Sequence, residues 1–224
     1  IFGSSRAAHH YVPKIIREET NMTTFNVGRD GMSLSYYTAL LKGILAHHHP
    51  KVVILDLNLN DFQLRENKKS AMVASLLPYV ADNPGVAELI KEKEPIEYWK
   101  AKISKLYRYN SLPASIAQHN MGIGQKNYNG YEPLKGNKLK SIPDTLELNN
   151  NYREDAGLVS RFEEFVTILK SKRIPLYVII SPSSKKRKFN SKATASRILA
   201  KHGSKLYDYS KFSGENRLKL FYDA

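Results

Sequence analysis

The sequence contains no cysteine, so disulfides, thiolate metal ligands and cysteine nucleophiles are all excluded. It also has no apolar run that approaches the length of a transmembrane helix. No signal peptide precedes Ile1 and Phe2, which we expect to lie in a strand, and the chain stops abruptly after "LKLFYDA". We interpret both ends as the edges of a longer protein. The absence of cysteine excludes thiol and disulfide chemistry, and it does not indicate the cellular compartment of the protein.

What is present is an ordinary globular composition. The 224 residues are 42% hydrophobic and 25% charged, which is enough for one large α/β domain with a sizeable core. The formal net charge of +14 would attract an anionic partner. The basic residues are spread along the chain, and we interpret the densest run, 184–189, as a solvated loop. Because zinc-finger spacing and RNP-like motifs are absent, we expect no nucleic-acid partner.

Short apolar runs alternate with amphipathic helical patterns along the chain. The expected strands are 1–3, 23–28, 51–59, 174–182 and 204–210. The expected helices are 7–19, 33–48, 153–173 and 191–203. Strands that alternate with helices favour a parallel sheet covered on both faces. The sequence therefore predicts a three-layer α/β/α fold with a flavodoxin-like parallel sheet of about five strands.

Residues 62–150 break this alternation. The segment begins with helical patterns and continues into a stretch, 122–151, that is rich in Gly, Asn, Lys and Tyr. We interpret it as a helical cap and a long loop inserted after the third strand of a single domain, 1–224. Loops of such length are usually functional lids or mobile segments.

A serine stands in the turn after the first expected strand. In Gly3-Ser4-Ser5-Arg6, a hydroxyl between a strand and a helix projects above the sheet, where ligands of parallel sheets bind. Its own backbone N–H points at a developing oxyanion. The alternative is that Ser4 or Ser5 only caps the helix.

Two further turns follow the second and third expected strands. In the second, Asn26 precedes Gly31, and a glycine lets the backbone offer its N–H to a ligand or simply makes a turn. The third holds Asn58, Asn60 and Asp61 at the end of an apolar strand. An asparagine amide there can donate to an oxyanion, or the side chains can close an Asx turn on their own backbone.

The order and spacing of these three turns resemble the SGNH (GDSL-like) hydrolases, and most closely their bacterial cell-surface branch with a GSSR-type first block. The resemblance implies a nucleophile at Ser5 and an oxyanion-hole asparagine at Asn60. It places the oxyanion-hole glycine on Gly31 rather than Gly28. The start of a final block, "FYDA", places the catalytic acid on Asp223.

The chain also departs from the family pattern. Ser4 stands where the family has an aspartate, and Asn58 stands where it has a glycine. The family's histidine, three residues after Asp223, would lie beyond Ala224. We therefore expect the general base outside this chain, and the chain by itself to be weak or inactive, since a serine hydroxyl needs a proton acceptor.

The seven histidines of the chain do not replace that base in our interpretation. His9 and His10 follow the serine turn within a helix, and the run 47–49 ends another helix at the opposite edge of the expected sheet. Adjacent histidines do not converge on one ion, so this run is read as a solvated helix C-terminus. We expect no metal and no other cofactor.

Arg6 and Arg29 flank two of the proposed turns. They are candidates to bind an anionic group of a substrate, and the alternative is an ion pair with Asp30 or Asp61.

The resemblance implies a serine esterase or O-acyltransferase that acts on acyl groups of carbohydrate, with a small-molecule or polysaccharide ester as substrate. It implies a bacterial cell-envelope or extracellular location and allows a membrane tether outside this chain. The alternative is a non-catalytic glycan-binding module on the same fold. The basic charge and the tyrosine-rich stretch "KNYNGYEPLKG" favour that alternative.

Overall fold

A computed structural model describes the fold of most of the chain. The described residues are 1–58, 60–63, 69–110, 113, 117, 121, 128–134, 152–182 and 191–210. The chain divides into two compact units. The sheet unit comprises Ile1–Leu34, Lys51–Leu64 and Tyr128–Ala224, and the helical unit comprises Ser35–Pro50 and Arg65–Asn127.

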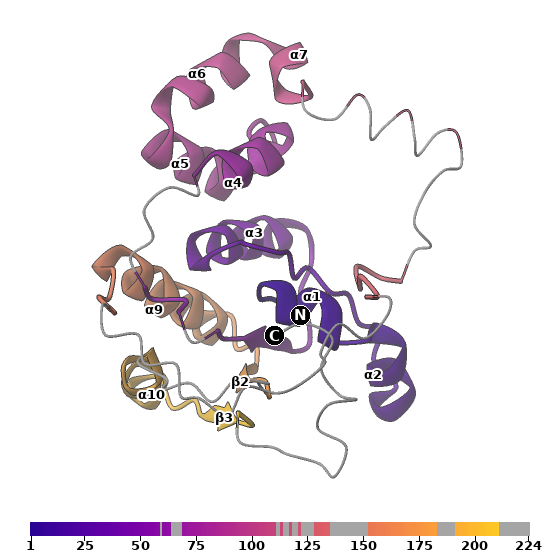
Figure 1. Ribbon diagram of the computed structural model, residues 1–224, viewed down its shortest axis with the longest axis vertical. Helices are drawn as coiled ribbons and strands as arrows, with labels where there is room; N and C mark the ends of the chain where they lie inside the picture. The colour runs from indigo at the N-terminus through magenta and orange to yellow at the C-terminus, as the bar shows by residue number, and fades with distance from the viewer. Residues whose placement is uncertain are drawn as a thin grey trace, which may run out of the picture. The chain divides into compact units, whose positions relative to one another are not determined.

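The described part of the sheet unit is built on a parallel sheet of three strands, in the order β1-β2-β3 (Figure 1). The strands are β1 (Val53–Asp56), β2 (Leu176–Ile180) and β3 (Leu206–Asp208). Each lies inside an apolar run from which the sequence predicts a strand, so these three predictions are confirmed in shortened form. A small mixed α/β fold with a parallel sheet is thus present.

The first residues of the chain lie beside β1. Phe2 forms an isolated parallel bridge with Leu55, and its N–H donates to the Ile54 carbonyl at 2.8 Å. The N–H of Asp56 donates in turn to the Phe2 carbonyl at 2.9 Å. The start of the chain therefore continues the hydrogen bonding of the sheet.

The expected strand at 23–28 is not formed as a strand. Its backbone still bonds to the first residues, since the N–H of Val27 donates to the Ile1 carbonyl at 2.8 Å. The N–H of Arg29 donates likewise to the Gly3 carbonyl at 3.0 Å. These bonds hold the segment beside the first residues of the chain without forming a regular ladder.

The helices in the described part of the sheet unit are α1 (Ser5–His10), α2 (Pro13–Thr20), α9 (Ala156–Ser171) and α10 (Ser191–Lys201). Helix α1 packs against β1, α9 against β2 and α10 against β3. The prediction of a single helix over 7–19 is wrong. Pro13 disfavours the helical conformation of the residue before it, and Val12 is extended, so the chain turns between α1 and α2.

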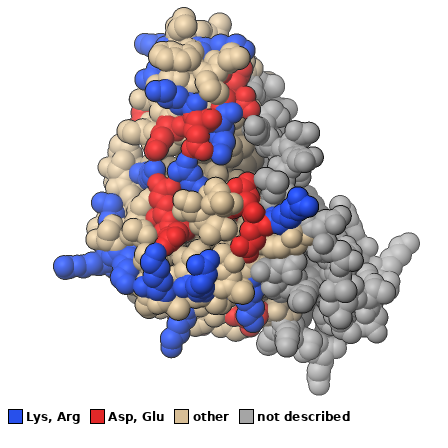
Figure 2. Space-filling model, turned by 90° about the vertical axis from the view of Figure 1, so that its left-hand side faces the viewer, with Lys and Arg blue, Asp and Glu red and all other residues tan. Residues whose placement is uncertain are grey.

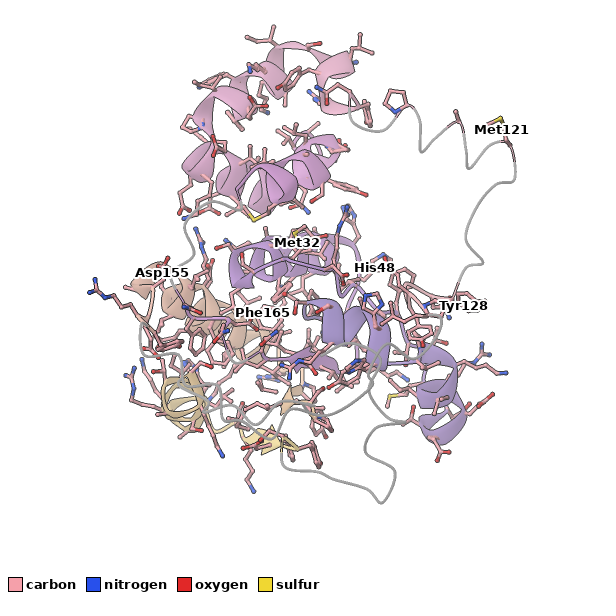
Figure 3. All side chains as sticks on the ribbon, viewed as in Figure 1. Met32, His48, Met121, Tyr128, Asp155 and Phe165 are labelled. Carbon is pink, nitrogen blue, oxygen red and sulfur yellow. The ribbon has the colours of Figure 1, made fainter. Side chains whose placement is uncertain are left out.

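Helix α9 supplies much of the core beneath the sheet. Asp155 caps its first turn by accepting a hydrogen bond from the Gly157 N–H at 2.7 Å (Figure 3). The apolar periodicity of 153–173 predicts a buried stripe of Leu158, Phe162, Phe165, Val166 and Leu169. The last four are buried, and Leu158 is half-buried. The Phe165 ring meets the Phe2 ring edge to face at 5.3 Å, which anchors the start of the chain over the sheet.

The helical unit contains most of the predicted insertion and also helix α3 (Leu34–His47) after its first residue. Its other elements are α4 (Lys69–Leu76), the 3₁₀ helix η1 (Leu77–Tyr79), α5 (Pro84–Lys93), α6 (Pro95–Ile103) and α7 (Lys105–Arg108). Among the described residues, none of these helices, nor any in the sheet unit, has the length and apolarity required to cross a membrane. The predicted loop 122–151 is described only at 128–134.

Candidate active site

The first turn places Ser5 at the start of α1. Gly3 has a φ of +145°, and a Cβ on it would lie 2.9 Å from the Asp56 carbonyl oxygen, so only glycine fits the turn. Ser4 occupies the N-cap position, yet its side chain makes no capping hydrogen bond. The hydroxyl of Ser5 is half-buried and has no hydrogen-bond partner among the residues that the structure describes. The capping alternative is therefore wrong for Ser4, and the Ser5 hydroxyl is left for another partner.

The second turn separates the roles of its two glycines. Gly28 is buried, and a Cβ there would lie 2.7 Å from the Ala8 backbone nitrogen, so this glycine lets the turn pack on α1. Gly31 is exposed, with a φ of +72° and open space around a Cβ position. Of the two, Gly31 is the glycine with an exposed backbone, and its role as an oxyanion donor stays a prediction.

Asn26 is a structural residue. Its buried amide nitrogen donates to the carbonyls of Ala7 at 2.6 Å and of Tyr11 at 3.0 Å. Its amide oxygen accepts from the Gly28 N–H at 2.9 Å. These bonds use both ends of the amide to hold α1 on the second turn.

The third turn is closed on its own backbone through Asp61. The buried Asp61 carboxylate accepts from the Asn58 N–H at 2.7 Å and so closes the turn on its own backbone. Asn60 is half-buried, and its backbone carbonyl accepts from the Gln63 N–H at 3.0 Å. Its side-chain amide has no hydrogen-bond partner within the described part of the chain.

Backbone hydrogen bonds bring these three turns to one edge of the sheet. The first turn is bonded to the second through Gly3 and Arg29, and to β1, which leads into the third, through Phe2 and Asp56. Within the described part of the chain, no hydrogen bond joins Ser5, Gly31 and Asn60 to one another. Asp223, the fourth predicted catalytic residue, lies outside the described residues.

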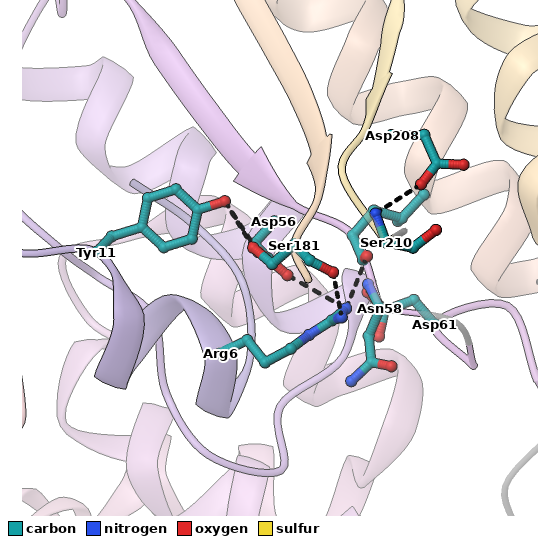
Figure 4. A network of polar contacts seen from close by, with 9 residues as sticks. Arg6, Tyr11, Asp56, Asn58, Asp61, Ser181, Asp208 and Ser210 are labelled. Atoms are coloured by element: carbon teal, nitrogen blue, oxygen red, sulfur yellow. Dashed lines mark hydrogen bonds and ion pairs between the residues drawn. The ribbon is translucent and has the colours of Figure 1, made fainter. Parts of the chain in front are cut away.

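A buried polar cluster lies beside the first turn (Figure 4). At its centre is Asp56, the last residue of β1, whose carboxyl oxygens face Arg6 of α1 at 3.3 Å and the Tyr11 hydroxyl at 2.9 Å. The Ser181 hydroxyl, which follows β2, also donates to this carboxyl. Arg6 donates further to the carbonyls of Leu57 at 2.9 Å and Ser181 at 3.3 Å. The cluster joins α1 to the carboxyl ends of two strands.

Burial dominates the electrostatics of this cluster. It raises the pKa of the Asp56 carboxyl above its ordinary value, while Arg6 and the two hydroxyl donors oppose that rise. Burial also raises the pKa of Tyr11, so its phenol stays a neutral donor. The partner of Arg6 is thus Asp56, and neither Asp30 nor Asp61.

Sequence reasoning missed the cluster, although one signal was available. Asp56 is a charged residue in the middle of the apolar run 51–59, and such residues are rarely buried without a partner. Arg29, in contrast, is exposed and makes no ion pair with any described residue, so it remains free to meet an anionic group.

His9 is held between two distant segments. Its Nε2 lies 3.0 Å from a carboxylate oxygen of Asp30, and its Nδ1 lies 2.6 Å from the Glu132 carbonyl oxygen. Burial lowers the pKa of His9, but the hydrogen bonds to Glu132 and Asp30 outweigh it and raise the pKa overall. Since both ring nitrogens face acceptors, His9 is not arranged to take the proton of Ser5.

No group of three or more His, Asp or Glu residues that could hold a metal ion occurs within the described ranges. Comparison of the chain with models of known protein families, with curated proteins and with solved structures finds no match.

Proposed function

We propose that this protein is a serine hydrolase or acyltransferase of the SGNH type, acting on ester-linked acyl groups of a carbohydrate. The observation that carries the proposal is the Ser5 hydroxyl, which follows the first turn and has no partner among the described residues. The turns with Gly31 and Asn60 lie on the same edge of the sheet. Backbone hydrogen bonds run from 25–29 through 1–3 to β1, β2 and β3, and this order of segments supports the flavodoxin-like arrangement that the proposal assumes.

In the proposed reaction the first turn supplies the nucleophile, and each of the three turns supplies a donor to the oxyanion. The Ser5 oxygen attacks the ester carbonyl carbon, and its proton passes to a base as the carbonyl oxygen becomes an oxyanion. The backbone N–H groups of Ser5 and Gly31 and the amide of Asn60 donate to that oxyanion. As the tetrahedral species collapses, the bond from the carbonyl carbon to the sugar oxygen breaks, the base returns its proton to that oxygen, and the acyl group stays on Ser5. Water or a second hydroxyl then takes the acyl group.

In the family that the sequence resembles, the proton acceptor is a histidine three residues after the catalytic acid. In this proposal the acid is Asp223, and it orients that histidine. His9 does not fill this role, because Asp30 and Glu132 occupy both of its ring nitrogens. Arg29 is exposed beside the second turn and suits an anionic group on the sugar. A bacterial cell-envelope or extracellular location belongs to the same proposal.

The experiment compares the effects of substituting two neighbouring serines in the full-length protein. Hydrolysis of p-nitrophenyl acetate, and then release of acyl groups from an acylated polysaccharide, are measured for Ser5→Ala and Ser4→Ala. We expect Ser5→Ala to lower kcat by about a thousandfold or more. Ser4→Ala should keep most of the activity, since Ser4 makes no capping hydrogen bond.

Undiminished turnover in Ser5→Ala would exclude Ser5 as the nucleophile. An inactive wild-type protein that binds acidic glycan in a salt-sensitive way would instead favour a glycan-binding module.

A further inference from the structure

Helix α6 presents an apolar stripe to solvent. Ile96, Trp99 and Ile103 are spaced at i, i+3 and i+7 and therefore share one face of the helix. They are 70%, 56% and 85% exposed, and Leu106 of the adjoining α7 is 82% exposed. We call these four residues the α6 stripe. Large aliphatic and aromatic side chains grouped at such exposure mark an interaction site rather than scattered surface residues.

The stripe is not the face by which α6 packs. The buried residue of α6 is Ala101, which lies on the side of the helix away from the stripe. The helix packs against α5, α7 and η1, all within the helical unit. The packing of α6 on these described elements therefore does not use the stripe.

Basic residues flank the stripe. Residues 95–109 contain four basic residues and one acidic residue, which gives a net charge of +3. Lys100 directly follows Trp99, and Lys102 directly precedes Ile103. Lys105 lies between Ile103 and Leu106. Lys100 pairs with the one acidic residue, Glu97, at 2.9 Å. Figure 2 shows one face of the molecule, on which basic, acidic and uncharged side chains are intermixed.

We propose that the α6 stripe docks the protein on an anionic lipid bilayer, with α6 lying in the plane of the interface. Ile, Leu and Trp side chains enter the boundary between headgroups and acyl chains, and flanking lysines meet anionic headgroups. Three of the four stripe residues are aliphatic, which does not suit a carbohydrate, and an apolar protein partner would not call for the flanking charge. This inference is independent of the chemistry proposed for Ser5.

The experiment uses a reporter that the sequence provides. Trp99 is the only tryptophan in the chain, so its fluorescence reports on the stripe alone. The whole chain is mixed with vesicles of phosphatidylcholine, or of phosphatidylcholine with about 30% phosphatidylglycerol. We expect a blue shift of Trp99 and co-sedimentation with the anionic vesicles, both weakened as salt is raised.

Paired variants separate the apolar and the charged parts. Ile103→Ser with Leu106→Ser should lower partition into anionic vesicles at least about tenfold, whereas Ile15→Ser, on the exposed surface of α2, should not. Lys102→Gln with Lys105→Gln should weaken binding to anionic vesicles, whereas Lys14→Gln on α2 should leave it unchanged.

Four results would overturn the proposal. They are an unshifted Trp99 spectrum, equal partition into neutral and anionic vesicles, unchanged binding of the Ile103 and Leu106 variant, and lipid-free self-association that this variant abolishes.

Discussion

Asn26 and Asn60 both follow segments from which the sequence predicts strands, and the structure gives them different roles. Asn26 is buried and uses its amide oxygen and nitrogen on α1 and the second turn. Asn60 is half-buried and has an amide without a hydrogen-bond partner among the described residues. A polar side chain whose bonding capacity is used inside the fold contributes to stability. One that remains unused at the carboxyl edge of a sheet is available to a ligand.

This difference predicts the effect of removing the Asn60 amide. Asn60→Ala should lower kcat for an ester substrate by about 10²–10³, because the oxyanion loses one donor in the transition state. The KM should change little, since the ground-state carbonyl carries less charge. Steady-state kinetics of the longest natural form of the protein measures both constants.

Asn58→Ala is the matched control for Asn60→Ala. It keeps the backbone N–H that bonds to Asp61, so its kcat should stay close to that of the wild type. Equal losses in the two variants would assign the effect to the shape of the turn rather than to an oxyanion donor.

Among the elements, those with strong periodicity or continuous apolar runs are the ones that sequence predicts. The runs at 51–59 and 174–182 form β1 and β2, and the stripe of α9 is buried as expected. The break before Pro13 and the missing strand at 23–28 depend on local backbone geometry. Hydrophobic periodicity predicts neither the break nor the missing strand. It also does not predict that the carboxyl of Asp56 contacts Arg6 and Ser181.

The packing of the second turn on α1 predicts that substitutions at its two glycines lower the stability by different amounts. Gly28→Ala should lower the free energy of unfolding by about 1–3 kcal/mol, because its Cβ would press on the Ala7 and Ala8 backbone. Gly31→Asn should cost under about 1 kcal/mol, since asparagine tolerates the left-handed region and nothing lies within 4 Å of the new Cβ. Urea unfolding measures both. A wild-type value for Gly28→Ala would contradict the close approach of the turn to α1.

At the scale of the whole molecule, segments far apart in sequence complete the surroundings of the first turn. His9 joins α1 to Asp30 of the second turn and to Glu132, which lies beyond the helical unit in sequence. The Asn26 N–H adds a bond to the Asn129 carbonyl at 2.8 Å. The sequence suggests an insertion at 62–150, but the structure returns to the sheet unit already at Tyr128 and groups most of α3 with the insertion. Composition marks such boundaries poorly, because they depend on long-range contacts.

The His9 link predicts a specific pH dependence of stability. The pKa of His9 is raised above its ordinary value of 6.5, so the folded protein holds a proton that the unfolded chain has begun to lose. This contribution is complete below pH 6.5 and disappears as the pH rises through the pKa of the folded state. It should amount to less than about 1 kcal/mol, because the Asp30 carboxylate is largely exposed and screened. NMR titration of the His9 ring gives the pKa directly, and urea unfolding from about pH 5.5 to 8.5 gives the change in stability. Asp30→Asn should return the pKa of His9 toward its ordinary value and flatten this part of the profile. A wild-type His9 pKa at or below 6.5 would contradict an imidazolium held between Asp30 and the Glu132 carbonyl.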